Sequence, residues 1–266
     1  MGEYGDVYKG VYNGREVAVK LLHVDTVLGL DDRQYINEIG NLLRVKHPNI
    51  IQLLGYCYEI QNELIEYNGA TDFSKHIYRV LCFEYLQGGS LDKHLHAQSF
   101  APSWGTRYNI IKGICEDNSM EPKLADFGLS TLFTKSHTHV TERVMGSRKY
   151  MPPEFLEGCK ISPKNDVFSL GVVMMDIMIG PTGYGNSLEM VDVAQEILTK
   201  WSTVIEATST YRSEKLIQVE TCIKLAMHCV DSRRDNRPTV ADSLDTLFFC
   251  EEKGIHSSSS SQICVT

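Results

Sequence analysis

The feature that most restricts the fold is an alternating stretch near the start of the chain, YGDVYKGVYNGREVAVKLL at residues 4–22. Apolar and polar side chains alternate there on both sides of Asn13-Gly14. Alternation with a period of two is typical of β-strands, and an Asn-Gly pair between two such runs is a strong hairpin signal. The sequence therefore predicts two antiparallel strands in this stretch.

After the hairpin the period of the pattern changes. Residues 31–46 have helical spacing, which predicts an apolar helix face formed by Ile36, Ile39, Leu42 and Leu43. Two more strands are expected in NIIQLLGYCYEI and RVLCFEYL, with residues 61–78 between them as a polar surface loop. These strands and the one helix predict a β-rich lobe of about 80 residues.

The rest of the chain is mostly helical in pattern. GGSLDKHLH opens a helix with Ser90 as its N-cap, and helical spacing continues after Pro152-Pro153 to about Phe249. The run VFSLGVVMMDIMIG, which begins at Val167, is apolar on every side and predicts a helix that is buried all round. The serine-rich end, HSSSSSQICVT, is expected to be disordered. The whole layout predicts an α+β fold of two lobes.

Composition and charge exclude several classes of function. A formal net charge of −8 argues against nucleic acid or an anionic membrane as the main partner. The most apolar run contains Asp176 and is too short to span a bilayer, and no signal-peptide pattern follows Met1. Eight cysteines without a Cys-x-x-Cys pair indicate reduced thiols, with Cys222 and Cys229 on one apolar helix face. We therefore expect a cytoplasmic chain.

Three residue groups near the start have the spacing of a phosphate-binding site. Glycines in GEYGDV, Gly2 to Val7, would let backbone amides approach phosphates closely, although the first glycine of such a loop would precede Met1. Lys20 ends the alternating run VAVK, where its ammonium can pair with phosphate oxygens. Glu38, on the helix that follows, is a predicted partner that would hold Lys20 in place.

Further along, several motifs occur in a defined order. Asp126-Phe127-Gly128 offers a carboxylate, which is a hard ligand suited to Mg²⁺ that bridges phosphates. Glu154 lies in MPPEF, and Arg237 in RRDNRP is its predicted partner. Asp166, at the start of the buried helix, would favour the helix dipole and organise nearby backbone.

These motifs, in this order, resemble those of the eukaryotic protein kinase domain. LCFEYLQGGSLDKHL, GTRYNIIKGICE, MPPE and DVFSLGVV are similar to segments of plant receptor-like serine/threonine kinases in particular. The likeness extends from Gly2 to about Phe249. It implies a two-lobed kinase fold that transfers phosphate from ATP to protein serine or threonine, and longer relatives that are membrane-anchored with a cytoplasmic kinase domain.

The resemblance also implies roles for single residues and boundaries for the lobes. It places the small lobe at 1–82, a hinge at 83–86, the helical lobe at 87–249 and the tail at 250–266. Asp126 would hold Mg²⁺. Candidate phosphorylation sites are Thr134, Ser136, Thr138 and Thr141. The residues that would bind or position ATP are Gly2, Gly5, Val7, Ala18, Lys20, Glu38, Phe83, Glu84 and Leu86.

One part of the family pattern is missing. In the family, GIC-E leads along a helix into a loop of the His-Arg-Asp-Leu-x-x-x-Asn type, which supplies the general-base aspartate and a second Mg²⁺ ligand. Here Glu116 is followed at once by DNSMEPKLADFG, so roughly thirty residues are absent. Asp117-Asn118 fit a turn instead, and the His-x-Asp or His-x-x-Asp strings at His23 and His228 stand elsewhere. No catalytic residue is identified.

This gap leaves three hypotheses for the chain. The first is an ATP-dependent serine/threonine protein kinase, which is what the resemblance implies, although the missing loop predicts very weak transfer. The second is a pseudokinase that acts as a nucleotide-binding or regulatory interaction module, and the third is a shortened product of splicing or gene prediction. The gap also predicts an incomplete helical lobe, in which apolar faces of the helix at Val167–Ile179 lack a partner. ATP, Mg²⁺ and a protein partner are the expected ligands, and nucleic acid is not.

Overall fold

The computed structural model describes residues 5–22, 32–67, 70–96, 102–115, 123–128, 130, 138–141, 144–180, 190–208 and 211–259. The chain divides into two compact units. The first comprises residues 1–89 and 123–132, and the second comprises residues 90–122 and 133–266. The segment that carries Asp126 therefore belongs to the N-terminal unit, although the sequence boundaries placed it in the helical lobe at 87–249.

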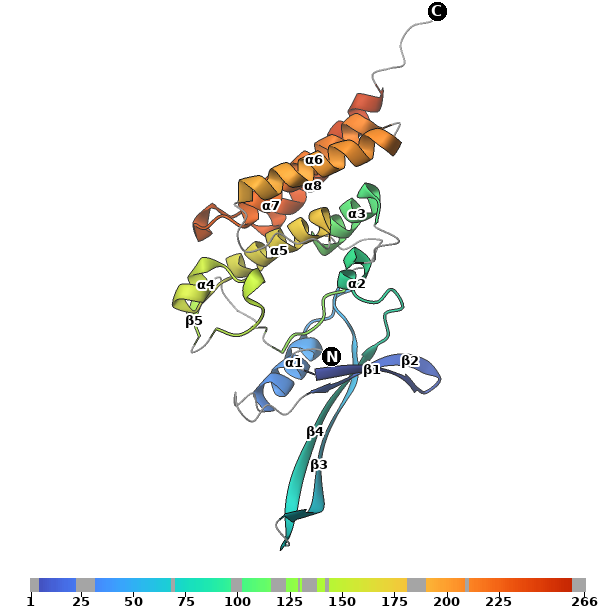
Figure 1. Ribbon diagram of the computed structural model, residues 1–266, viewed down its shortest axis with the longest axis vertical. Coiled ribbons are helices and arrows are strands. Elements are labelled where there is room, and N and C mark those ends of the chain that lie inside the picture. The colour runs from blue at the N-terminus through green and yellow to red at the C-terminus, as the bar shows by residue number, and fades with distance from the viewer. Residues whose placement is uncertain are drawn as a thin grey trace, which may run out of the picture. The chain divides into compact units, whose positions relative to one another are not determined.

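The first unit contains a four-stranded antiparallel sheet and one helix (Figure 1). Its strands are β1 (Gly5–Tyr12), β2 (Arg15–Leu22), β3 (Leu53–Tyr67) and β4 (Ala70–Glu84), in the spatial order β1-β2-β4-β3. Between β1 and β2, Asn13 and Gly14 have φ angles of 50° and 75°. Two positive φ angles are what a type I′ turn requires, so the predicted hairpin is confirmed.

The predicted surface loop at 61–78 is wrong, because residues 61–67 continue β3 and residues 70–78 belong to β4. The two strands stay paired from Leu53 to Tyr67, with Tyr67 opposite Ala70. Asn68-Gly69 separates them in the sequence, and this dipeptide is the strongest two-residue hairpin signal. Polarity misled the prediction because strands that are solvated on both faces need few apolar residues.

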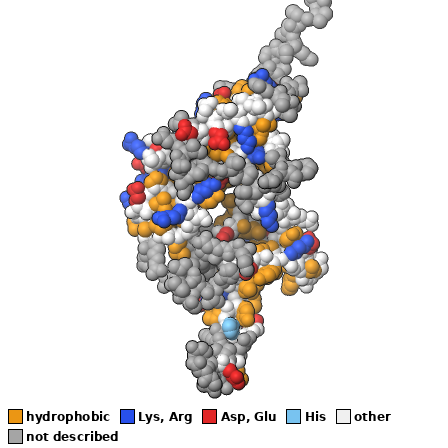
Figure 2. Space-filling view, viewed as in Figure 1, with side chains coloured by type: hydrophobic (Ala, Val, Ile, Leu, Met, Phe, Trp, Pro, Cys, Tyr) orange, Lys and Arg blue, Asp and Glu red, His pale blue; other side chains and the backbone are white. Residues whose placement is uncertain are grey.

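The outer part of β3 and β4 is a two-stranded ribbon. β2 pairs with β4 only at residues 80–84, and no third strand of the described residues pairs with the remaining length. Several apolar side chains of this hairpin are exposed, and Figure 2 shows hydrophobic side chains along it. They are Tyr56, Tyr58, Ile60 and Leu64.

The helix α1 (Asp32–Arg44) forms where the spacing predicted it, and half of the predicted apolar face is buried. Leu42 is 7% exposed and Ile39 packs against the same apolar cluster, whereas Ile36 and Leu43 are 62% and 60% exposed. The buried stripe also includes Glu38, a polar residue with a partner in the protein, so apolar spacing alone located this stripe only in part.

The second unit is mainly helical, which confirms the α+β prediction. Its elements are α2 (Leu91–His96), α3 (Trp104–Cys115), β5 (His139–Val140), η1 (Arg148–Tyr150), α4 (Pro153–Gly158), β6 (Lys160–Ile161), α5 (Pro163–Ile179), α6 (Met190–Thr208), α7 (Arg212–Cys229), η2 (Arg234–Asn236) and α8 (Val240–Ser259). α8 extends ten residues beyond the predicted helical end at Phe249, so residues 250–259 of the expected disordered tail are helical. Residues 260–266 lie outside the described part.

α5 is the centre of this unit, as its all-round apolar pattern predicted. Its buried side chains belong to one cluster with residues of α3, α6, α7 and α8. The expected exposure of an α5 face is wrong, because no large apolar side chain of α5 is exposed. The neighbouring helices close the core around α5 even though the sequence lacks the family's longer helix. Apolar surface is buried wherever partners of suitable shape are available.

α5 and α7 approach each other closely at Gly171. A Cβ atom at this position would lie 2.6 Å from the Cβ atom of Cys229 and 2.8 Å from the Ala226 carbonyl oxygen. Real Cβ atoms do not approach so closely, so this contact between the two helices requires glycine.

We expect Gly171→Ala to lower the free energy of unfolding by about 1–3 kcal/mol, because the methyl group overpacks a filled core. Gly105, in α3, is the matched control, because a Cβ there would meet only the Ser103 Oγ atom at 4.0 Å. Gly105→Ala should stabilise the helix by up to about 1 kcal/mol. Thermal unfolding of both variants checks this, and equal effects would contradict the packing argument.

The cysteines provide a second test of the core. Burial raises the pKa of the Cys229 thiol to about 11, while Cys57 is exposed. Only the thiolate reacts with alkylating agents. At pH 7.5 and without denaturant, iodoacetamide should therefore modify Cys57 and spare Cys222 and Cys229, which peptide mass spectrometry can quantify. Rapid labelling of all three thiols would show that this core is not formed.

Candidate functional site

The predicted nucleotide residues share one face of the sheet in the first unit. β1 and β2 place Val7 directly opposite Lys20, and β2 and β4 place Ala18 opposite Phe83. Directly opposed residues point to the same side of a sheet, and so do residues two apart in one strand. Val7, Ala18, Lys20 and Phe83 therefore lie on a common face.

Lys20 is the centre of a three-residue ion cluster. Its Nζ atom lies 3.2 and 3.1 Å from the two carboxylate oxygens of Glu38 and 2.9 Å from Oδ1 of Asp126. The side chains of Lys20 and Glu38 are 11% and 2% exposed, whereas that of Asp126 is 57% exposed. The predicted Lys20–Glu38 pair is thus formed, and the pair has an open side where Asp126 meets solvent.

The electrostatics of the cluster depend on the burial of Glu38. Burial raises the pKa of Glu38, and the Lys20 ammonium opposes this shift while the Asp126 carboxylate adds to it. One ammonium faces two carboxylates, so the cluster favours an additional cation. A Mg²⁺ ion beside Asp126 would supply that positive charge.

Asp126 has a backbone conformation that few residues adopt. Its φ angle is 69°, in the left-handed region where aspartate is better tolerated than most side chains. The next residue, Phe127, packs against the apolar cluster of Tyr35, Leu81 and Phe83. This packing fixes the backbone after Asp126, so its carboxylate is directed towards Lys20.

The other predicted nucleotide residues differ in what they contribute. A Cβ atom on Gly5 would lie 2.6 Å from the Leu21 carbonyl oxygen, so glycine is required there. Leu86 is half-buried against the same apolar cluster. Oε1 of Glu84 accepts from the Lys123 ammonium and from the Gln52 backbone amide, and the Glu84 backbone amide donates to the Gln52 carbonyl oxygen. Gly2 lies outside the described residues.

Two further residues connect the Asp126 segment to the rest of the first unit and were not predicted from the sequence. The Asn41 side-chain amide donates to the carbonyl oxygens of Phe127 and Ser130, and Lys123 pairs with Glu84. The only sequence signal for Asn41 is a polar residue one turn after Glu38, on the stripe that faces the sheet.

In the second unit, Arg237 and Glu154 form the predicted pair. The guanidinium donates from Nη1 and Nη2 to the two carboxylate oxygens, at 2.7 and 2.8 Å. The Arg237 side chain is fully buried and also donates to the backbone oxygens of Asp231 and Lys164. It therefore connects α4 and α5 to the segment before α8. Asp166 lies in the first turn of α5, where its charge favours the helix dipole.

The candidate phosphorylation sites are only partly described. Arg234 Nη1 donates to the Thr138 hydroxyl at 2.6 Å, and the Thr141 hydroxyl donates to the Cys159 carbonyl oxygen. Thr134 and Ser136 lie outside the described residues, as do Asp117-Asn118 and His23. The carboxylate of Asp231, near His228, accepts from the Arg233 amide and the Asn236 side chain, which is a local turn contact.

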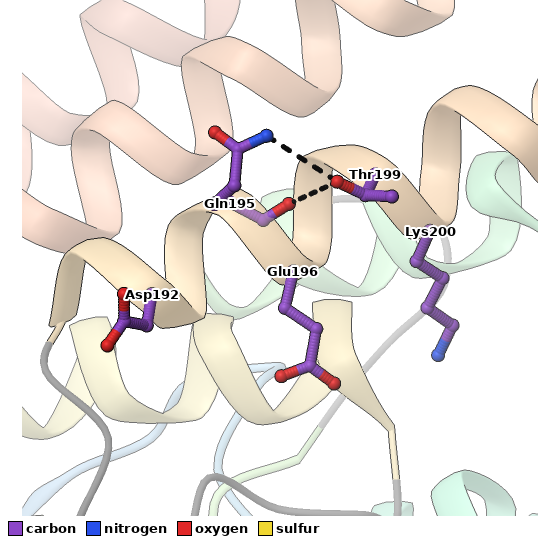
Figure 3. Close-up of a pocket in the computed structure, with 5 residues that line it drawn as sticks. All are labelled: Asp192, Gln195, Glu196, Thr199 and Lys200. Atoms are coloured by element: carbon purple, nitrogen blue, oxygen red, sulfur yellow. Dashed lines mark hydrogen bonds between the residues drawn. The ribbon is translucent and has the colours of Figure 1, made fainter.

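A shallow depression of about 450 Å³ lies on α6 in the second unit (Figure 3). It is lined by Asp192, Gln195, Glu196, Thr199 and Lys200. Thr199 is occupied by a hydrogen bond to the Gln195 carbonyl oxygen, and Lys200 donates to the Ile179 carbonyl oxygen at the end of α5. The depression contains none of the predicted site residues.

The side chains and helices of the described part of the chain bear on which ligands it can hold. No group of three or more His, Cys, Asp or Glu side chains there is arranged to hold a metal ion. A metal at Asp126 would thus need most of its ligands from groups other than the described His, Cys, Asp and Glu side chains. Within the same residues, no helix is long and apolar enough to cross a membrane.

Comparison with known proteins agrees with the resemblance seen in the sequence. A family model described as "Protein kinase domain" matches residues 1–117 and 112–249. Receptor-like serine/threonine-protein kinase SD1-8 of Arabidopsis thaliana is 28% identical over 281 residues, which cover 90% of this chain and 31% of that protein. Cysteine-rich receptor-like protein kinase 28 of the same plant is 30% identical over 280 residues, which cover 90% and 38%. The chain thus spans about a third of these relatives.

The buried Arg237–Glu154 pair permits a test of the helical unit. Glu154→Gln should lower the free energy of unfolding by about 3 kcal/mol, because it leaves a buried guanidinium without a compensating charge. Glu16→Gln is the control, because Glu16 pairs with Lys9 at the surface and its loss should cost at most about 1 kcal/mol. Chemical denaturation of both variants measures the difference, and equal losses would refute the structural role of the pair.

Proposed function

Because the chain belongs to the protein kinase family, as a domain of the receptor-like serine/threonine type, we propose that it binds ATP with Mg²⁺ but transfers phosphate very slowly. The observation that carries the proposal is the meeting of Lys20, Glu38 and Asp126. These residues come from a strand, a helix and a segment about ninety positions further along, so their meeting depends on the fold.

The residues present suit a metal-bound nucleotide. The Lys20 ammonium and the Asp126 carboxylate lie 2.9 Å apart on the partly open side of the cluster. Glu38 is held to Lys20 by both oxygens, so Lys20 can turn from Asp126 to a phosphate oxygen and keep its buried partner. Asp126 is then free to hold Mg²⁺, whose other ligands would be phosphate oxygens and water. Val7 and the partly buried Ala18 offer an apolar surface for the base, and the buried Phe83 packs beside Ala18.

We expect slow phosphate transfer because the chain lacks the His-Arg-Asp motif of the family. A positioned general base contributes about 10²- to 10⁴-fold to such a reaction, and no His-Arg-Asp motif occurs in the sequence. The family match falls into two pieces that overlap at residues 112–117, where the motif is missing. The SD1-8 alignment covers 281 positions, whereas 90% of 266 residues is about 239, so some forty positions face no residue of this chain.

The same observation favours a second interpretation, in which the chain is a shortened product of a longer kinase. The named relatives are receptor-like kinases, so we propose that a complete form has the catalytic loop, acts on protein serine or threonine, and is anchored with its kinase domain in the cytoplasm. The tryptic peptide GICEDNSMEPK, Gly113 to Lys123, spans the junction. Detection of this peptide in source tissue would show that the shortened chain is made. Peptides with an intact loop between the same flanks would show the complete form.

The proposal predicts measurable nucleotide binding that depends on Mg²⁺. Isothermal titration with Mg-ATP should give a dissociation constant that rises about tenfold or more in Lys20→Ala and in Asp126→Asn, because each removes a charged contact to phosphate or metal. Lys46→Ala, an exposed lysine of the same unit, is the control and should bind like the wild type.

Transfer is tested separately, with radiolabelled Mg-ATP and a generic protein substrate. Wild type and Lys20→Ala should give equally low incorporation. Wild-type turnover well above that of the Lys20→Ala variant would contradict slow transfer. A wild type that binds no Mg-ATP would contradict the binding proposal.

A further inference from the structure

The segment at residues 123–130 carries Asp126, yet burial alone does not determine its position. Leu124 is 54% exposed, and Ala125 and Asp126 are exposed as well. Exposed residues gain little from the hydrophobic effect, which is proportional to the apolar area removed from water. Phe127 is the exception, because it packs against the apolar cluster of the first unit. Polar contacts must therefore hold the segment on the side that precedes Asp126.

Lys123 provides such a contact at the beginning of the segment. Its Nζ atom donates to Oε1 of Glu84 at 2.9 Å, and the two side chains are only 15% and 27% exposed. The same Glu84 oxygen accepts from the Gln52 amide at 2.8 Å. One carboxylate at the end of β4 thus joins Lys123 to the residues that precede β3. A charged hydrogen bond with this degree of burial is stronger than an exposed ion pair.

Backbone hydrogen bonds connect the same three stretches. The Leu124 amide donates to the Asn49 carbonyl oxygen at 2.7 Å, and the Ile51 amide donates to the Leu124 carbonyl oxygen at 3.0 Å. On the other side, the Glu84 amide donates to the Gln52 carbonyl oxygen at 3.1 Å. Residues 49–52 therefore lie between the end of β4 and the Asp126 segment, and Lys123 reaches across them.

Asn41 provides the contact at the end of the segment. This residue of α1 is 9% exposed, and its side-chain amide donates to the carbonyl oxygens of Phe127 at 3.2 Å and Ser130 at 2.9 Å. Asn41 follows Glu38 by nearly one helical turn, so α1 supports both the lysine partner and the metal-binding segment. Asp126 lies between the contacts of Lys123 and Asn41.

We infer that Lys123 and Asn41 are positioning residues that clamp residues 123–130 onto the first unit from both ends. The clamp consists of the Lys123–Glu84 pair and the two Asn41 hydrogen bonds. It holds the Asp126 carboxylate beside Lys20, and neither Lys123 nor Asn41 needs to touch the nucleotide. The benefit to Mg-ATP rests on the proposed function, whereas the clamp itself is a property of the protein alone. All of its contacts lie within the first unit, so the missing catalytic segment contributes nothing to it.

Hydrogen exchange measured by NMR or by mass spectrometry tests the clamp without any ligand. Lys123→Met removes the charge and keeps most of the length of the side chain. We expect the amides of Leu124 and Ile51 to exchange about three- to tenfold faster, in line with the loss of one charge-assisted hydrogen bond. Amides in β1 and β2 should keep their wild-type rates. Lys123→Arg should restore slow exchange, and Lys46→Met is the matched control at an exposed site.

Asn41→Leu tests the other end of the clamp. It removes both side-chain donors and keeps a residue of similar size that favours helix. The Ser130 amide, which donates to the Phe127 carbonyl oxygen, should then exchange faster while the Leu124 amide changes less. If Lys123→Met accelerates exchange throughout β1 and β2, the whole first unit has been destabilised and that variant does not test the clamp. Asn41→Leu then provides the test.

Nucleotide titration separates the clamp from the proposed function. In Lys123→Met the dissociation constant for Mg-ATP should rise about three- to tenfold, whereas that for ATP in EDTA should not change, because only the metal depends on Asp126. Faster exchange in a protein whose wild type binds no nucleotide would support the clamp and contradict the proposed function. Wild-type exchange at Leu124, Ile51 and Ser130 in both variants would overturn the clamp.

Discussion

The ammonium of Lys20 is a nearly buried charge, and the first unit is built around the need to compensate it. Burying an unpaired ammonium is prohibitively costly, so carboxylates have to reach it. Glu38 does so from α1 and Asp126 from a segment far along the chain. One ion cluster therefore holds together a strand, a helix and an irregular segment. On the side of Asp126, which is 57% exposed, the same cluster is open to solvent.

The second unit is held together by the burial of the apolar helix α5 and by polar contacts at both ends of that helix. α5 is apolar on every side, and α3, α6, α7 and α8 cover it. The last carbonyl groups of α5 accept hydrogen bonds from Arg107, Lys200 and Trp201, which places two cations at the negative end of the helix dipole. The buried Arg237–Glu154 pair fixes the segments around the start of α5. These contacts give the unit a closed core although the catalytic loop of the family is missing.

The sequence predicted the features that depend on local patterns, but not those that depend on contacts between residues far apart in the chain. The Asn13-Gly14 hairpin, the buried α5 and the Lys20–Glu38 and Arg237–Glu154 pairs are all present. The loop predicted at 61–78 is paired strand at residues 61–67 and 70–78. The polar composition of this stretch predicted a loop, whereas its Asn68-Gly69 pair is a hairpin signal. Asn41 and Lys123 were missed because nothing in the sequence distinguishes a buried, hydrogen-bonded polar side chain from a solvated one.

The sequence by itself determined the family, the two types of lobe and the residue types able to bind a nucleotide, because motifs and periodicity are local properties of the chain. It also showed that no His-Arg-Asp motif occurs in the chain, since an absent motif needs no structure to be recognised. Tertiary structure alone decided that the Asp126 segment belongs to the first unit, which face of α1 is buried, and that α5 is covered. Each of these depends on contacts between residues far apart in the chain, and their free energies are set by burial and pairing that no local pattern encodes.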